Sequence, residues 1–156
     1  WRCTELGECA QEDDLNAIAN EMKQANGIIF GAPSYYATVP TLMKNFLDRV
    51  GRFVNLRGKV GGALTVARRS GSDTVLQELM FFMYVKEMII PGVYMWPAGF
   101  ALHPGDIRGD TEALKAVKEL GKRVAILGSR IRQHSLPWMD DPIPSQLRPA
   151  FGDDWR

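Results

Sequence analysis

Two adjacent tyrosines stand in a loop between prolines, directly after a short apolar run at residues 28–30. Flat aromatic faces beside small residues and free backbone amides suit a planar heteroaromatic ligand. The tyrosines could instead pack on neighbouring helices or at a subunit contact, so both interpretations stay open. Under the ligand hypothesis, the binding residues in this loop are Pro33, Ser34, Tyr35, Tyr36, Ala37 and Thr38.

A second loop combines two guanidinium groups, two hydroxyls and a glycine where a helix is predicted to begin. Backbone amides at a helix start favour an anion, and so do arginines. A solvated basic turn is the alternative interpretation. The chain has neither the GxGxxG nor the GxxxxGK(S/T) pattern, so we expect neither kind of nucleotide phosphate loop. The candidate binding residues here are Arg68, Arg69, Ser70 and Gly71.

The two cysteines, Cys3 and Cys9, precede the first predicted helix with five residues between them. They are too few for a disulfide framework, which favours a reducing, cytoplasmic location. A structural zinc or an iron–sulfur cluster needs about four ligands, so two ordinary thiols are the simpler interpretation. His103 and His134 lie near no Cys or carboxylate pair at metal-ligand spacing, and no Ser or Cys lies in a nucleophile-elbow pattern. We therefore predict no catalytic side chain.

The sequence predicts alternating helices and strands, and each of the two loops follows a predicted strand. The pattern predicts helices over residues 12–25, from 40, over 73–88 and over 110–134, and strands over 28–30, 60–67 and 89–96. Asp13 and Asp14 are expected to cap the first helix, Asn26-Gly27 to end it, and Asp73 to cap the third. Alternation of this kind predicts an α/β domain, residues 1–134, with a parallel sheet between helices. Ligands bind such sheets at the carboxyl ends of the strands, where both loops lie.

Residues 135–156 have no periodic pattern and hold four prolines, so we predict an irregular C-terminal tail. Because the tail carries Trp138, Met139, Phe151 and Trp155, we expect either a free tail or a segment lying along a partner subunit.

Composition excludes other classes of protein. Apolar residues make up 46% and charged residues 24%, as in an ordinary globular domain. The formal charge of +1 argues against a nucleic-acid partner. No apolar run approaches the ~18 residues that span a bilayer, so we expect no membrane span.

The stretch GIIFGAPSYYATVPTLMKNFLDRV, residues 27–50, resembles the third strand, flavin loop and following helix of the flavodoxin-like NAD(P)H-dependent FMN reductases. It is most similar to the iron–sulfur flavoprotein branch of that family. The matching motifs are Ala32-Pro33-Ser34-Tyr35 and Lys44-Asn45-Phe46-Leu47-Asp48-Arg49. The second loop, residues 68–71, lies where the family has a loop containing Gly and Arg beside the flavin ring. The resemblance covers about residues 3–134.

The resemblance implies a flavodoxin-like, doubly wound parallel sheet and an oxidoreductase. FMN would pass electrons from NAD(P)H to a small-molecule acceptor: a quinone, free flavin or a metal species. Residues 33–38 would hold the ring and ribityl chain, and residues 68–71 would stabilise negative charge on the reduced ring. A homodimer or homotetramer with the flavin near a subunit interface is also implied.

Two departures from the family pattern leave alternatives open. Only its third, fourth and fifth strands are visible, so we expect this chain to lack the first strand–helix–strand unit. Cys3-x5-Cys9 matches the last two members of the branch's Cys-x2-Cys-x2-Cys-x5-Cys motif. An electron-transfer iron–sulfur flavoprotein, with Cys3 and Cys9 as two ligands of a 4Fe-4S cluster, is therefore the second hypothesis. A non-catalytic, oligomerising flavodoxin-like domain is the third.

Overall fold

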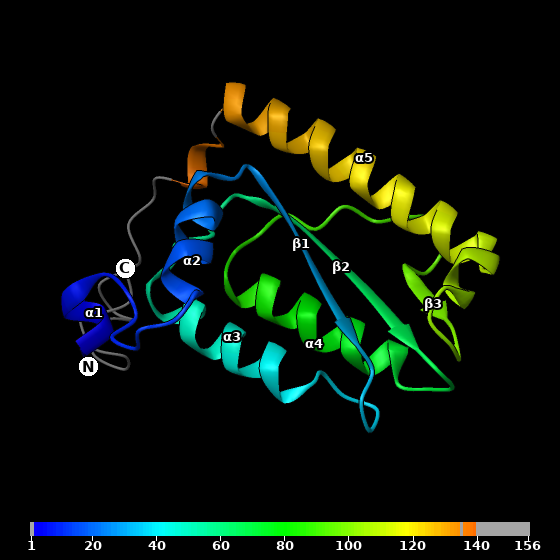
Figure 1. Cartoon of the computed structure of the whole chain (residues 1–156). Coiled ribbons are helices and arrows are strands. Elements are labelled where there is room, and N and C mark those ends of the chain that lie inside the picture. Colours follow the sequence, from blue (N-terminus) through cyan, green and yellow to red (C-terminus); the bar gives the residue numbers. More distant parts are fainter. Residues whose placement is uncertain (1, 135, 140–156) are drawn as a thin grey trace.

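The computed structural model describes residues 2–134 and 136–139, and within them three parallel strands form one sheet (Figure 1). The strands are β1 (Gly27–Pro33), β2 (Val60–Ala67) and β3 (Ala98–Phe100), hydrogen-bonded in the order β1-β2-β3. The register pairs Gly27 with Val60 and Thr65 with Ala98. The α-helices are α1 (Arg2–Leu6), α2 (Leu15–Gln24), α3 (Thr41–Phe53), α4 (Ser72–Val85) and α5 (Thr111–Gln133). The helix–strand alternation predicted from the sequence is confirmed.

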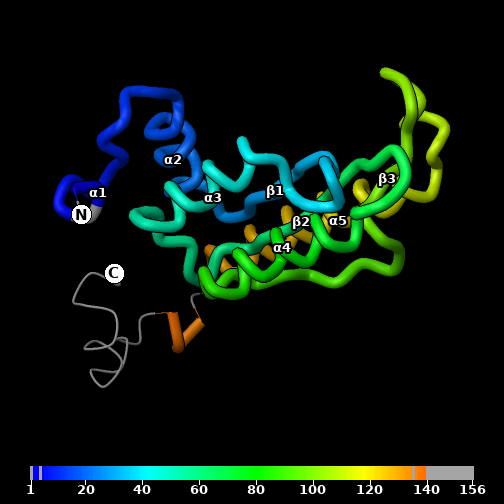
Figure 2. Tube along the Cα trace, turned by 90° about the horizontal axis from the view of Figure 1, so that it is seen from below, coloured from blue at the N-terminus to red at the C-terminus, as the bar shows by residue number. Residues whose placement is uncertain are grey.

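Helices cover both faces of the sheet. Figure 2, seen from below, shows α4 in front of β2 and α5 behind it. On the α5 face, Val60 packs with Leu120 and Val124. On the other face, strand residues Phe30 and Ala63 join a larger buried cluster with side chains of α2, α3 and α4. A strand buried on both faces needs apolar residues on both, which explains the mostly apolar sequence of β2; its buried Thr65 hydroxyl donates to the Ala32 carbonyl.

The third strand is not where the sequence predicts it. Ile89 makes only an isolated parallel bridge with Val60, and the ladder resumes at Ala98. Pro91 has no N–H to donate, so the segment leaves β2 soon after Ile89. Pairing returns when the Thr65 N–H donates to the Pro97 carbonyl at 3.0 Å. The prediction of a strand over residues 89–96 is therefore wrong, and the carboxyl end of the strand lies at Phe100 instead.

Helix ends also differ from the predictions. In front of α2, the Asp13 carboxylate accepts from the Leu15 N–H at 3.1 Å, whereas Asp14 makes no side-chain cap. The helix ends at Gln24, and the next residue, Ala25, has an extended backbone, so the helix stops before Asn26-Gly27. Helix α4 follows a left-handed Gly71, so Asp73 lies in its first turn and does not cap it. The short α1 has no counterpart among the predicted elements.

The start of the tail packs on its own chain. A short 3-10 turn, η2 (Pro137–Met139), follows α5. The Arg57 guanidinium lies 5.8 Å from the centre of the Trp138 ring, and Met139 lies against Gly58. The predictions made for Phe151 and Trp155 concern residues outside the described part of the chain. Among the residues that the structure describes, no helix is long and apolar enough to cross a membrane.

Candidate functional site

The two predicted ligand loops leave neighbouring strands at the carboxyl edge of the sheet and touch each other. The Ser34 N–H donates to the Val66 carbonyl at 2.8 Å, which extends the β1–β2 ladder into the first loop. The Ser34 hydroxyl then donates to the Ser70 carbonyl at 3.0 Å. The structure therefore brings together the two sets of candidate residues that lie more than thirty residues apart in the sequence.

A tight turn forms the tip of the first loop. Tyr35 and Thr38 exchange two backbone hydrogen bonds, at 3.1 and 3.2 Å. Between them Tyr36 and Ala37 are left-handed, with φ of 51° and 61°. Two positive φ angles define a type I′ turn, which Gly and Asn normally occupy. A non-glycine residue with this backbone conformation costs about 1–3 kcal/mol, and such residues cluster at functional sites. The turn leaves Tyr36 fully exposed.

Gly71 lets the loops approach closely. It precedes α4 with φ of 89°, in the left-handed region that favours glycine. A Cβ at this position would lie 2.4 Å from the Ala37 Cα and 2.4 Å from the Ser34 Oγ. The first of these neighbours is backbone, so it cannot rotate away. Glycine is therefore required where the second loop packs under the first.

A cavity of about 220 Å³ opens between the two loops. Of the ten predicted binding residues, six line it: Ser34, Tyr36, Ala37, Arg68, Arg69 and Ser70. The other four, Pro33, Tyr35, Thr38 and Gly71, lie in the same two loops but are not among its lining residues.

The cavity is rich in unused hydrogen-bond donors. Arg68 and Arg69 are exposed and have no partner among the described residues, and no carboxylate is among the described lining residues. Such a site favours a ligand that carries acceptors or negative charge.

A third loop at this edge was missed by the sequence analysis. It follows β3 and begins beside the second loop, because the Ala101 N–H donates to the Ala67 carbonyl at 3.1 Å. Because the strand is predicted at residues 89–96, the sequence does not place this loop at the carboxyl edge. The loop contains the exposed His103, three residues beyond β3. The short apolar run after Pro97 is the sequence signal that could have revealed it.

Asp110 closes this third loop. Its carboxylate accepts from the Ala113 N–H and the Phe100 N–H, both at 3.0 Å. These two backbone donors, Ala113 first, lower the pKa of the Asp110 carboxyl below its usual value. The carboxylate therefore joins the end of β3 to the start of α5.

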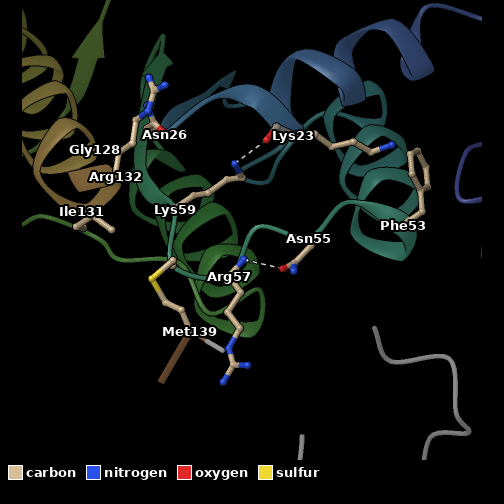
Figure 3. Close-up of a pocket in the computed structure, with 11 residues that line it drawn as sticks. Lys23, Asn26, Phe53, Asn55, Arg57, Lys59, Gly128, Ile131, Arg132 and Met139 are labelled. Carbon is tan, nitrogen blue, oxygen red and sulfur yellow. Dashed lines mark hydrogen bonds between the residues drawn. The ribbon is translucent and has the colours of Figure 1, made fainter. Parts of the chain in front are cut away.

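A larger cavity, of about 440 Å³, lies at the opposite, amino edge of the sheet (Figure 3). Two of its cations, Lys59 and Arg57, are already engaged. The Lys59 ammonium donates to the Lys23 and Ala25 carbonyls at 2.9 and 2.6 Å, at the carboxyl end of α2. Arg57 forms an ion pair with Glu87 at 2.7 Å. Arg132 also lines this cavity and, like Arg68 and Arg69, is exposed without a partner among the described residues, so the two cavities differ in how many of their cations are engaged.

Cys9 lies in a small polar cluster beside α3. Its Sγ is 3.0 Å from Nη2 of Arg49, whose guanidinium also binds the Asp13 carboxylate at 2.7 and 3.0 Å. The pKa of the Cys9 thiol is lowered, first by a hydrogen bond from the Gln11 backbone and then by Arg49. Arg49 in turn lowers the pKa of Asp13, with a further contribution from the Leu15 N–H. The cluster favours the thiolate form of Cys9.

The residues of this region do not by themselves complete an iron–sulfur site. Cys3 lies in α1 and Cys9 beyond it, both half-buried and both free thiols. In the described part of the chain, no group of three or more His, Cys, Asp or Glu side chains could hold a metal. Two thiols are half of the roughly four ligands that a cluster requires.

Comparison with known proteins agrees with the fold. A Trp repressor binding protein from Bacillus subtilis superimposes with a TM-score of 0.60 at 22% identity, over 70% of this chain and 73% of that chain. The fold is therefore flavodoxin-like. The family model for NADPH-dependent FMN reductase matches residues 2–101, and the chain belongs to this family.

Sequence relatives place the chain in the iron–sulfur flavoprotein branch. An iron–sulfur flavoprotein from Methanocaldococcus jannaschii is 36% identical over 135 residues, which cover 79% of this chain and 69% of the relative. An NAD(P)H dehydrogenase (quinone) from Archaeoglobus fulgidus is 29% identical over 127 residues, covering 74% of this chain and 65% of the relative. The chain spans between 56% and 69% of the length of the first three iron–sulfur flavoproteins that it matches.

The smaller cavity fits the ring of FMN. The flavin ring is flat, carries carbonyl acceptors and gains negative charge on reduction. Arg68 and Arg69 offer free donors and positive charge to such a group, and Tyr36 offers an exposed aromatic face at the rim.

Proposed function

We propose that this chain is the flavin-ring-binding part of an FMN-dependent oxidoreductase that takes electrons from NAD(P)H. The observation that carries the proposal is the contact between the loops after β1 and β2, which forms an open cavity lined by the unpartnered Arg68 and Arg69. Membership of the FMN reductase family supports FMN as the ligand of that cavity.

The chain's own residues have a positioning and electrostatic role. Pro33–Thr38 hold the ring and the ribityl chain through backbone amides and the Tyr36 ring. Arg68, Arg69, Ser70 and Gly71 stabilise negative charge on the reduced ring. When bound, FMN supplies the hydride and electron chemistry, so no side chain needs to act as nucleophile or general base.

The family and one relative suggest an electron donor and an acceptor. NAD(P)H is proposed as the donor because the family model describes an NADPH-dependent reductase. The candidate acceptors are a quinone, free flavin and a metal species. A quinone is favoured because one relative is named as an NAD(P)H dehydrogenase (quinone).

Self-association is part of the proposal. The outer face of α4 exposes Phe81 and Tyr84, whose rings stack with centroids 6.2 Å apart. An exposed apolar patch of this kind is typical of a contact surface. We propose a homodimer or homotetramer that uses this face, which light scattering of the protein and of a Phe81→Ser variant would test.

Flavin titration tests the central proposal. Adding the wild-type chain to FMN should quench flavin fluorescence with a saturable isotherm, and NADPH should then bleach the flavin band under anaerobic conditions. A chain that leaves FMN fluorescence unchanged at high protein concentration would sink the proposal. That result would favour the third hypothesis, a non-catalytic oligomerising domain.

An electron-transfer iron–sulfur flavoprotein is the second candidate. Two observations favour it: the names of the relatives and the Cys3–Cys9 spacing. The absorption spectrum of the purified protein separates the candidates. Flavin bands alone support the first, whereas a broad visible shoulder that a reductant bleaches supports the second.

A further inference from the structure

A short hydrogen bond ties the first loop to α4. The Thr38 hydroxyl donates to Oε1 of Glu78 at 2.5 Å. Thr38 is exposed at the end of the turn, whereas Glu78 is half-buried on the helix. An O–H···O⁻ bond of this length belongs to the strong, charge-assisted class. The bond therefore restrains the loop more firmly than a neutral surface contact would.

Helix α4 holds the first loop at two points. Its first contact is made by Gly71, which precedes the helix and packs against Ala37. Its second is made by Glu78, which lies seven residues further on, about two helical turns. Because Gly71 also belongs to the second loop, α4 fixes the position of one loop relative to the other.

The turn between these points is strained and has to be held. Thr38 closes it by exchanging backbone bonds with Tyr35, and both residues between them have positive φ. If the Thr38 side chain were released, the backbone of Tyr36 and Ala37 could relax toward negative φ. Tyr36 would then leave the rim of the cavity.

We propose that Glu78 is a positioning residue for the flavin: through Thr38 it holds the strained turn that presents Tyr36 to the cavity. The proposal rests on the proposed function, since it assumes that this cavity takes the flavin ring. Glu78 is not among the cavity's lining residues, and it acts through the loop alone.

A double-mutant cycle tests the bond. The variants are Thr38→Val, Glu78→Ala and the two combined, with Glu78→Gln as the conservative change because its amide oxygen still accepts. Glu21→Ala is the matched control: Glu21 is an exposed helical glutamate with no side-chain partner among the described residues. Near-UV circular dichroism would confirm that each variant is folded.

Two readouts are measured on each protein. The first is the rate at which chymotrypsin cuts the Tyr36–Ala37 bond of the FMN-free chain, followed by mass spectrometry. The second is the FMN dissociation constant from fluorescence quenching. We expect Thr38→Val and Glu78→Ala each to raise both by about ten-fold, or about 1.4 kcal/mol. The double variant should be no worse than either single one. Glu78→Gln keeps the acceptor but loses the charge, so it should fall between wild type and Glu78→Ala, and Glu21→Ala should stay within about two-fold of wild type.

Each other outcome counts against a specific statement. Additive effects, or an unchanged cleavage rate, would show that the bond does not hold the turn. Faster cleavage with an unchanged FMN constant would show that the turn does not position the flavin. If the wild-type chain takes up no FMN, the proposed function fails and the positioning role fails with it, while the cleavage rates still decide whether Glu78 holds the turn.

Discussion

At the carboxyl edge of the sheet, the Arg68 and Arg69 guanidinium groups have no partner among the described residues. At the amino edge, the Lys59 ammonium donates to two carbonyls and Arg57 pairs with Glu87. The amino edge nevertheless has the larger cavity, of about 440 Å³ against about 220 Å³. Size alone would therefore select the amino edge and not the edge proposed for FMN. The two edges differ in how many of their cations are engaged with the protein, since Arg132 is the only cation that lines the amino-edge cavity without a partner among the described residues.

The helix ends at the amino edge explain why Lys59 and Lys86 are engaged there. Helices α2, α3 and α5 all end there, and the carboxyl end of a helix has unpaired carbonyls and partial negative charge. Lys59 satisfies carbonyls at the end of α2, and the Lys86 ammonium donates to the Gly51 carbonyl of α3 at 2.9 Å. Lys59 and Lys86 therefore stabilise helix ends at this edge, whereas Arg68 and Arg69 at the other edge have no partner among the described residues.

Two glycines provide the largest expected contrast. In Gly71→Ala, the new Cβ would meet the Ala37 backbone in addition to an unfavourable left-handed φ. We expect a loss of about 2–4 kcal/mol of stability and FMN binding weaker by about 100-fold or more. In Gly58→Ala, with φ of 72°, the three atoms nearest to the new Cβ all belong to the flexible Met139 side chain. That variant should lose about 1 kcal/mol and keep FMN.

Denaturant unfolding and fluorescence titration of both glycine variants would check this. If both bound FMN as tightly as wild type, the two loops would not form the site.

Paired arginines test the contrast in charge. We expect the combined Arg68→Ala and Arg69→Ala variant to raise the FMN dissociation constant by about 10-fold, because charge-assisted bonds are worth about 1.5–3 kcal/mol before solvent screening. The combined Arg130→Ala and Arg132→Ala variant removes two cations from the last turn of α5. It should lower stability by less than about 2 kcal/mol and leave FMN binding unchanged. Equal effects of the two variants on FMN binding would remove the distinction between the edges.

Exposed tyrosines give a smaller effect. Tyr36→Ala removes a ring from the cavity rim, and aromatic stacking is worth about 0.5–1.5 kcal/mol. We expect FMN binding weaker by about 2- to 10-fold. Tyr84→Ala is the control, because Tyr84 is also exposed but lies toward the far end of α4. Stronger loss of FMN from the Tyr84 variant would mean that the α4 face, and not the loop, holds the flavin.

The sequence predicts much of this arrangement because local patterns carry it. Apolar spacing predicts α3 and α5, and the mostly apolar stretch of residues 60–67 predicts β2, since burial on both faces demands apolar side chains. The loops were then placed by topology, because parallel strands end at the same edge. The ten candidate residues follow from that placement, and the six that line the cavity come from both loops.

Other features could not be predicted, because they depend on contacts between residues far apart in the sequence or on a conformation that is rare for their residue types. Because of Pro91, the third strand lies at residues 98–100 and not at the predicted residues 89–96. The loop that follows it, which contains His103, therefore lies elsewhere than the sequence predicts. The hydrogen bond from Thr38 to Glu78 joins residues forty positions apart, so no spacing rule predicts it. The left-handed Tyr36 and Ala37 were also missed, because turn statistics favour Gly and Asn at such positions.

Substitution of Asp110 should have the smallest effect on FMN binding. It tests whether the comparison of the two edges also holds for a group at the carboxyl edge that is already hydrogen-bonded. It lies at the carboxyl edge, yet its carboxylate is fully engaged with the Ala113 and Phe100 N–H groups. By the reasoning applied to the amino edge, such a group stabilises the fold and does not bind a ligand. Asp110→Asn should therefore leave the FMN dissociation constant within about two-fold at neutral pH and lower stability by about 1 kcal/mol.

The pH dependence of that loss has a definite sign. The folded state lowers the pKa of Asp110, so its carboxylate contributes stability above the unfolded value of about 3.9. That contribution disappears as the pH falls through the lower, folded pKa, because the protonated carboxyl accepts from backbone N–H groups less well. Urea unfolding of wild type and Asp110→Asn should therefore differ most at neutral pH and converge in acid. A gap that persisted in acid, or a marked loss of FMN at pH 7, would show that engaged groups at this edge also serve the ligand.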